Sequence, residues 1–125
     1  LRAAAGRSRV GPEASGDLEP ETPAARGPQL VLVEGSGDRR TFEVGIMARI
    51  GRGPENEVVI PREDVGDRHA RIYLRNGQYW LEDLTSYGGT RLNGLPVDAP
   101  TVLADGDRVE VGGATLVFDR GFWRR

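Results

Sequence analysis

The stretch "HARIYLRNGQYWLEDL", residues 69–84, decides the fold class. In its first half Ala70, Ile72 and Leu74 point one way, and the polar or aromatic residues between them point the other. Alternation with a period of two is typical of a half-buried antiparallel strand. Asn76-Gly77 has the sequence of a two-residue hairpin turn, after which "QYWLEDL" returns as the partner strand. The stretch therefore predicts an antiparallel β-hairpin.

Short runs of the same kind fill the chain from residue 29 to residue 119. They are separated by turns rich in glycine, proline and asparagine, and no stretch keeps a helical period over three turns. Ten or so short strands within about 90 residues predict an all-β sandwich or barrel, with function carried by the loops. The further expected strands are "QLVLVEG", "RRTFEV", "ARIGR", "EVVI", "TRLN", "PVDAPTVL", "DRVEV" and "ATLVF".

The two ends of the chain differ from this middle part. Residues 1–28 contain repeated glycine and proline, no aromatic residue, and only Leu1, Val10 and Leu18 as sizeable apolar side chains. Such a segment buries too little surface to offset its ordering entropy. We therefore expect a disordered tail or linker over 1–28, one domain over 29–119, and a short C-terminal tail over 120–125.

Composition excludes several classes of function. The chain has no cysteine and one histidine, which argues against a disulfide framework or a metal site, and nothing calls for a cofactor. Residues 29–119 hold ten arginines against fifteen acidic residues, a balance that disfavours nucleic-acid binding. No apolar run approaches the roughly 20 residues of a membrane span. Since the chain starts at Leu1 without a signal-peptide pattern, we expect a cytoplasmic fragment, or the cytosolic domain of a larger or membrane protein.

Two catalytic patterns fail on inspection. Gly51-Arg52-Gly53 begins like a dinucleotide fingerprint, but the third glycine is missing and no helix follows. His69, Ser86 and Asp83 include the residue types of a nucleophilic triad, yet nothing places Ser86 on a strained nucleophile turn. The sequence therefore predicts a protein that is not an enzyme.

Four blocks share an order and spacing with one known family. They are "IGRGPENEVVI", "VGDRHARI", "GQYWLEDLTSYGGTRLNG" and "LADGDRVEVGGATLVF". The set resembles the forkhead-associated (FHA) domain over roughly residues 29–119. The resemblance implies a β-sandwich of about eleven short, mostly antiparallel strands that binds phosphothreonine peptides, and hence a protein or phosphoprotein partner.

The resemblance also implies site residues. Arg52 matches the family's phosphate-binding arginine; the alternative is a surface arginine paired with Glu55 or Asp67. The family's phosphate-binding serine is Gly66 here, Asp67 stands where a basic residue is frequent, and the asparagine that holds the peptide backbone is Gly88. The full peptide-binding set implied is Arg52, Gly66, Asp67, Arg68, Gly88, Gly89, Thr90 and Asn93.

These departures weaken the expected phosphate site. Each lost hydrogen bond to a charged group costs about 1.5–3 kcal/mol, so two losses cost roughly two to three and a half decades of affinity. Asp67 adds repulsion toward a dianion and offers Arg52 a built-in substitute for phosphate. The backbone N–H groups of Gly66 and Gly88 leave room for a residual anion site. The sequence thus predicts an interaction module with weakened phosphate selectivity, or alternatively a phosphorylation-independent interaction or structural domain.

Three further residues take roles from the resemblance. His69 matches a structural histidine that braces the binding loops, with Ser86 and Thr90 as bracing partners. Thr22, in "EPETPAA", is a candidate phosphorylation site in the tail; the alternative is an incidental threonine in a linker. The partner is expected to be a protein, such as a Ser/Thr kinase substrate or the chain's own tail.

Overall fold

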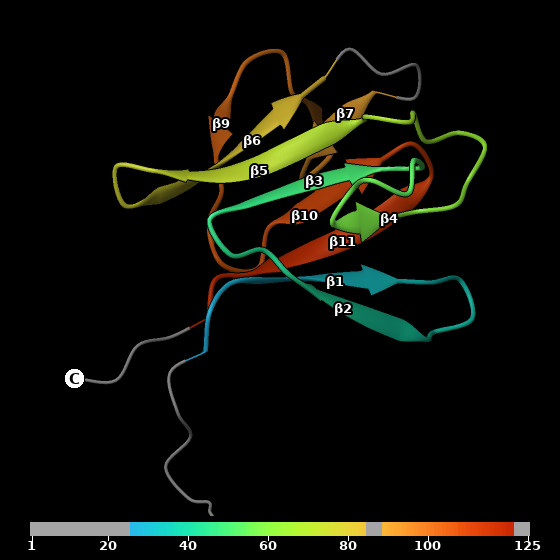
Figure 1. The fold of residues 1–125 in the computed structure, drawn as a ribbon, viewed down its shortest axis with the longest axis horizontal. Helices are drawn as coiled ribbons and strands as arrows, with labels where there is room; N and C mark the ends of the chain where they lie inside the picture. Colours follow the sequence, from blue (N-terminus) through green and yellow to red (C-terminus); the bar gives the residue numbers. More distant parts are fainter. Residues whose placement is uncertain (1–25, 85–88, 122–125) are drawn as a thin grey trace, which may run out of the picture.

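The structure is a computed structural model of the 125-residue chain and describes residues 26–84 and 89–121. These residues form eleven strands and no helix (Figure 1). The strands are β1 (Gln29–Val33), β2 (Arg39–Glu43), β3 (Met47–Gly51), β4 (Val58–Val59), β5 (Ala70–Arg75), β6 (Gln78–Asp83), β7 (Thr90–Leu92), β8 (Leu95–Pro96), β9 (Thr101–Val102), β10 (Arg108–Val111) and β11 (Ala114–Asp119).

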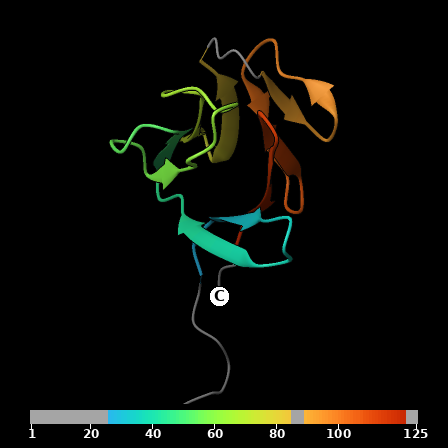
Figure 2. The same ribbon diagram turned by 90° about the vertical axis from the view of Figure 1, so that its right-hand side faces the viewer.

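The strands divide into two sheets that face each other (Figure 2). One sheet has the order β2-β1-β11-β10-β7-β8, and the other has the order β4-β3-β5-β6-β9. The pairing of β3 with β4 is parallel, and the other pairings are antiparallel. The predicted all-β sandwich is confirmed.

The hairpin of residues 70–83 forms as its sequence predicts. Strands β5 and β6 pair along their whole length, from Ala70 opposite Asp83 to Arg75 opposite Gln78. Asn76 and Gly77 have φ angles of 53° and 76°, the left-handed values that a type I′ turn requires at both central residues. Asparagine and glycine adopt these angles more readily than other residues, which explains the turn sequence.

The segment "PVDAPTVL" differs from its prediction as a single strand. Residues 95–96 form β8 in the six-stranded sheet, whereas residues 101–102 form β9 in the other sheet. Pro96 and Pro100 lack the N–H group that a continuous strand would need for its ladder. Val97 is buried between the two short strands. The segment therefore crosses from one sheet to the other.

The core lies between the sheets and follows the alternation of the strands. Leu30 and Leu32 of β1 and Leu116 and Phe118 of β11 are buried on one side. The rings of Phe118 and Tyr79 on β6 lie 5.6 Å apart, which joins the two layers. The buried core also includes Val44, Ala48, Ile50, Val58, Ile60, Val65, Ala70, Ile72, Leu81, Val97, Leu103, Val109, Val111 and Ala114.

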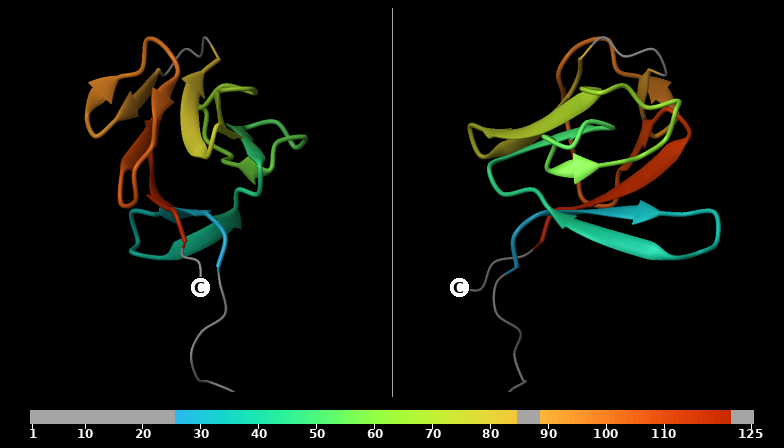
Figure 3. Two further views of the ribbon diagram at one scale, coloured as in Figure 1. Left: turned by 90° about the vertical axis from the view of Figure 1, so that its left-hand side faces the viewer. Right: turned by 45° about the vertical axis from the view of Figure 1, so that its right-hand side comes forward.

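The described chain enters and leaves the sandwich at one end. Gln29 pairs with Asp119, and Arg26 Nη1 lies 2.8 Å from Asp119 Oδ2. The connections that follow β3 and β4 lie at the opposite end (Figures 1 and 3). Within residues 26–84 and 89–121, no helix has the length and apolar character needed to cross a membrane.

Candidate functional site

Two connections meet at the end of the sandwich away from the termini: residues 52–57, between β3 and β4, and residues 60–69, between β4 and β5. The Arg52 N–H donates to the Gly66 carbonyl at 2.9 Å, and the Gly53 N–H donates to the Asp67 carbonyl at 3.2 Å. A Cβ on residue 51 would overlap the carbonyl oxygen of Asp67, so only glycine allows this approach. The Gly51-Arg52 pair therefore places Arg52 against Gly66-Asp67.

Asn56 holds the same two connections together. Its side-chain amide donates to the carbonyl of Gly53 at 2.7 Å and to the carbonyl of Asp67 at 2.8 Å. The residue is buried, and its Oδ1 has no hydrogen-bond partner among the residues described. The sequence showed Asn56 only as part of a glycine- and proline-containing loop, because its bonding partners lie on two different loops.

Arg52 faces Asp67, the second of the two carboxylates that the sequence offered as its partner. Its Nε and Nη2 each lie 3.4 Å from Asp67 Oδ1. Glu55, the other candidate, instead lies 3.6 Å from Nε of Arg68, whose side chain is 77% exposed. Arg52 and Asp67 are themselves 46% and 73% exposed, so water weakens their ion pair.

A hollow of about 170 Å³ lies beside this ion pair. Arg52 is its one basic lining residue. Asp67, Glu63 and Asp64 supply three carboxylates, and Val65 and Gly66 complete the lining. The charge of Asp64 is paired with Arg62, but Glu63 and Asp67 still outnumber Arg52, so a negatively charged ligand would meet more like charge than opposite charge here.

His69 connects this pair of loops with the residues that precede β7. The side chain is fully buried. Its Nδ1 accepts a hydrogen bond from the Gly66 N–H at 3.0 Å, so the proton of the neutral ring lies on Nε2, which donates to the Gly89 carbonyl at 2.7 Å. The Gly66 N–H is therefore bound to His69, and its part in a residual anion site stays a prediction.

Ser86 and Thr90 are the two residues expected to brace His69. Ser86 lies outside the described residues, as does Gly88 of the predicted peptide-binding set. Thr90, which is buried, donates from Oγ1 to Asp83 Oδ1 at 2.6 Å. Gly89 precedes it with a φ of 74° and reaches His69 through its carbonyl.

Asn93 belongs to a separate turn, between β7 and β8. Its φ is 51°, and its amide donates to Asp107 Oδ1 at 3.1 Å and accepts from the Arg108 N–H at 2.9 Å. Both ends of the side chain are thus bonded to the start of β10. The structure brings Arg52, Gly66 and Asp67 into direct contact and joins Gly89 to them through His69. The side chain of Asn93 bonds instead to Asp107 and Arg108.

An ion pair supports the loop that carries Arg52. Glu57 accepts hydrogen bonds from the Arg49 N–H at 2.8 Å and from the Arg49 guanidinium at 3.0 and 2.8 Å. The guanidinium and backbone N–H of Arg49 lower the pKa of Glu57 to about 2. Arg49 also donates to the carbonyl of Glu55 at 3.2 Å. These bonds fix the end of the loop next to β4.

Asp64 connects the β4–β5 segment with the turn between β10 and β11. Its Oδ2 accepts from the Gly113 N–H at 2.8 Å, and its Oδ1 accepts from Arg62 Nε at 2.9 Å. The Arg62 guanidinium is the main cause that lowers the pKa of Asp64. Asp64 is therefore engaged within the protein, although it also lines the hollow at Arg52.

The described part of the chain contains no group of three or more histidine and acidic side chains that could hold a metal ion. The one buried imidazole, His69, bonds to backbone groups of both neighbouring segments. This end of the molecule offers a rim of loops that carries Arg52, Arg62 and Arg68 together with several carboxylates.

The comparison with known families decides the identity of this rim. The family model described as FHA domain matches residues 48–112, just over half of the chain. The chain belongs to the FHA domain family. The match covers the loops that carry Arg52, Asp67 and His69, and it agrees with the eleven-stranded sandwich.

Relatives of this FHA domain occur among regulators. The glycogen accumulation regulator GarA of Mycobacterium tuberculosis is 39% identical over 94 residues, which cover 74% of this chain and 57% of the relative. The chain spans about half the length of the curated relatives it matches.

Solved structures agree with the family. An FHA domain from a study of phosphothreonine-dependent FHA domain interactions is 32% identical, with a TM-score of 0.65, over 75% of this chain and 96% of that one. The FhaA FHA domain, crystallised in complex with the intracellular domain of Rv3910, is 33% identical, with a TM-score of 0.63, over 74% of this chain and 99% of that one. FHA domains are non-enzymatic modules that bind proteins, and this chain is a protein-interaction module of that kind.

Proposed function

We propose that this FHA domain binds a partner protein through the loops around Arg52, and that Asp67 occupies Arg52 in place of a phosphate group. The observation that carries the proposal is the contact of both Nε and Nη2 of Arg52 with one carboxylate oxygen of Asp67. A carboxylate is smaller and less charged than a phosphate, but it satisfies the same donors. Phosphothreonine would have to displace it.

The surroundings of Arg52 support weak phosphate selectivity. Gly66 has no hydroxyl, and its N–H is bonded to His69. Glu63 and Asp67 add negative charge to the lining of the hollow, whereas the charge of Asp64 is paired with Arg62. Without the hydroxyl and with the added repulsion, the phosphate of a bound peptide gains less here than where serine and a basic residue flank the arginine.

One observation favours a residual phosphate response as the second candidate. Exposed ion pairs contribute only about 0.2–1 kcal/mol, and the Arg52–Asp67 pair is largely exposed. A phosphate group could therefore exchange with Asp67 at modest cost. The two candidates differ in how much affinity phosphorylation adds.

Fluorescence polarisation with a phosphothreonine peptide library and its unphosphorylated twin tests the proposal. In the native protein we expect less than about tenfold preference for the phosphorylated set. Asp67→Asn releases Arg52 and should raise phosphopeptide affinity about fivefold, the equivalent of ~1 kcal/mol. Glu63→Gln is the matched control, because it removes a carboxylate from the same hollow without releasing Arg52; we expect a gain of no more than about twofold.

Arg52→Ala completes the test. Combined with Asp67→Asn, it should abolish the gain in phosphopeptide affinity, because the phosphate then has no guanidinium to bind. A strong phosphate preference in the native protein would contradict the proposal, as would equal gains from Asp67→Asn and Glu63→Gln.

The remaining parts of the function belong to the same proposal. We propose that the chain has no catalytic activity of its own, supported by the bonding of both ring nitrogens of its one histidine. The partner is a protein, with a phosphorylated kinase substrate or the chain's own tail as specific forms. Thr22 as a phosphorylation site lies outside the described residues and stays a prediction, as do the cytoplasmic location and the boundaries at residues 28 and 120.

A further inference from the structure

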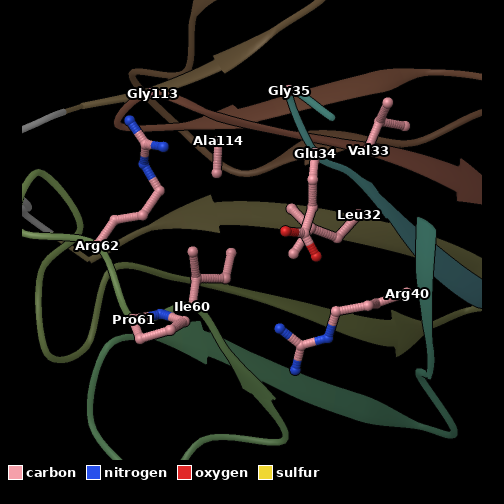
Figure 4. Close-up of a pocket in the computed structure, with 10 residues that line it drawn as sticks. All are labelled: Leu32, Val33, Glu34, Gly35, Arg40, Ile60, Pro61, Arg62, Gly113 and Ala114. Atoms are coloured by element: carbon pink, nitrogen blue, oxygen red, sulfur yellow. The ribbon is translucent and has the colours of Figure 1, made fainter. Parts of the chain in front are cut away.

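A crevice of about 270 Å³ lies between the exposed edges of the two sheets (Figure 4). Strand β2 ends one sheet, and strand β4 ends the other. The crevice opens between the β1–β2 hairpin, the segment that follows β4, and the start of β11. It shares no lining residue with the hollow at Arg52.

The floor of the crevice is apolar. Leu32, Ile60 and Ala114 line it although they are 6%, 1% and 5% exposed, and Pro61 forms part of the wall. Because these side chains keep only small exposed areas, a ligand that covers them gains a limited hydrophobic contribution. The crevice is therefore suited to a single apolar side chain.

Charged side chains surround this floor. Arg40 and Glu34 both reach into the space beside Ile60, and Arg62 lies beyond it next to Gly113 (Figure 4). Arg62 is engaged by Asp64. In the described part of the chain no carboxylate lies within ion-pair distance of Arg40, whose guanidinium lies 5.3 Å from the ring centre of Phe42. Arg40 is therefore the cation available to a ligand.

Arg40 also has a purely structural explanation. Edge strands often carry an inward-pointing charge, which prevents them from pairing with another chain. Arg40 lies opposite Leu32 in the ladder, on the inner face of edge strand β2. That explanation predicts effects of Arg40 on self-association, but none on peptide binding.

We infer that this crevice is a second peptide-binding site, which takes one leucine- or isoleucine-sized side chain of a partner protein and pairs an adjacent aspartate or glutamate with Arg40. The volume lies just below the roughly 300–1,000 Å³ of small-molecule pockets, so a single side chain fits better than a cofactor. The combination of an apolar floor and an available guanidinium requires both features in the ligand.

Glu34 is expected to have the opposite effect to Arg40 on ligand binding. Its carboxylate lies in the same crevice and repels the acidic residue of the ligand. Removing this charge should therefore strengthen binding, whereas removing the charge of Arg40 should weaken it. If Arg40 only prevented edge strand β2 from pairing with another chain, the two substitutions would not have opposite effects on peptide binding.

The test is a titration of the full ¹⁵N-labelled chain with capped tetrapeptides, Ac-Gly-Leu-Asp-Gly-NH₂ and Ac-Gly-Asp-Leu-Gly-NH₂, followed by amide chemical shifts. At least one should shift the amides of Val33, Gly35, Gly113 and Ala114, with a dissociation constant on the order of a millimolar. Versions with Lys for Asp, or Gly for Leu, should bind at least about fivefold more weakly.

Four variants complete the design. Arg40→Gln should weaken binding about fivefold, and Glu34→Gln should tighten it about twofold. Arg39→Gln is the matched control, since Arg39 is the neighbour of Arg40 on the same strand but lines a different, outward surface; it should leave binding unchanged. Arg52→Ala should also have no effect, which separates this site from the function proposed for the Arg52 loops.

Several results would overturn the inference. They are an absence of crevice shifts at saturating millimolar peptide, equal binding of the lysine peptides, or equal losses in Arg40→Gln and Arg39→Gln. If Arg40→Gln fails to fold, the peptide set and Glu34→Gln still decide the question, because unchanged or weaker binding to Glu34→Gln contradicts the proposed charge pairing.

Discussion

The two loops of the candidate site approach each other closely because Gly51 has no side chain. In Gly51→Ala the new methyl group would overlap the Asp67 carbonyl, and backbone must move to admit it. We expect a loss of about 1–3 kcal/mol in the free energy of unfolding, measured by urea denaturation. Gly35→Ala is the control, because a Cβ there meets nothing within 4 Å. Equal effects of the two substitutions would contradict this account of Gly51.

For single residues, the sequence predicted the partner of Arg52 but not the contacts that hold the loops together. The hypothesis that Asp67 pairs with Arg52 came from the family resemblance, which assigns both residues to the binding loops, and the geometry agrees with it. The role of Asn56 and the bond between Gly66 and His69 could not be predicted. Both contacts depend on how closely the backbones of the loops approach each other. That distance leaves no recognisable pattern in the residue types.

The β3–β4 loop depends on the ion pair that ends it, Arg49 with Glu57. The pKa of Glu57 in the folded protein is about 2, below its ordinary value of 4.5, so its contribution is present above pH 4.5 and is lost as the pH falls toward 2. Both side chains are partly exposed, so the contribution is no more than about 1 kcal/mol. Urea denaturation between pH 6 and pH 2 should show it as part of the acid-induced loss of stability.

Two variants separate this ion pair from the other carboxylates. Glu57→Gln should lower stability at pH 6 and flatten the decline at lower pH. Arg49→Gln should reproduce both effects, since it removes the cause of the lowered pKa. A decline that is unchanged in both variants would show that Glu57 does not contribute to it.

Among the elements, the β5–β6 hairpin shows where strand prediction succeeds, and the β8–β9 segment shows where it fails. The hairpin combines alternation with an Asn-Gly turn, and two signals that agree leave one register. In "PVDAPTVL" the apolar residues suggested one strand, but the prolines divide it between two sheets. Strand β8 pairs locally with β7 across Asn93-Gly94, whereas the place of β9 depends on its pairing with the more distant β6, which local sequence does not contain.

For the whole molecule, the first and last strands of the chain are neighbours inside the six-stranded sheet. Strand β1 pairs with β2 on one side and with β11 on the other, and Leu30 and Leu32 fill the core between the sheets. Because β1 and β11 are far apart in sequence, neither is stable until they pair. We therefore expect the sandwich to fold and unfold as one cooperative unit. Just before β1, Arg26 pairs with Asp119 and the Pro28 carbonyl accepts from the Val44 N–H, so both residues are joined to the sandwich. The predicted division of the chain places a tail before residue 29.

That division leads to a test by truncation. Removing residues 1–25 should change the free energy of unfolding by less than about 0.5 kcal/mol, because the predicted tail buries little surface. Removing residues 1–33 deletes β1, exposes the edges of β2 and β11, and should leave an unfolded chain. Circular dichroism and urea denaturation distinguish the two cases. A clear loss of stability in the shorter truncation would mean that residues 1–25 pack on the sandwich, and the boundary at residue 28 would then be wrong.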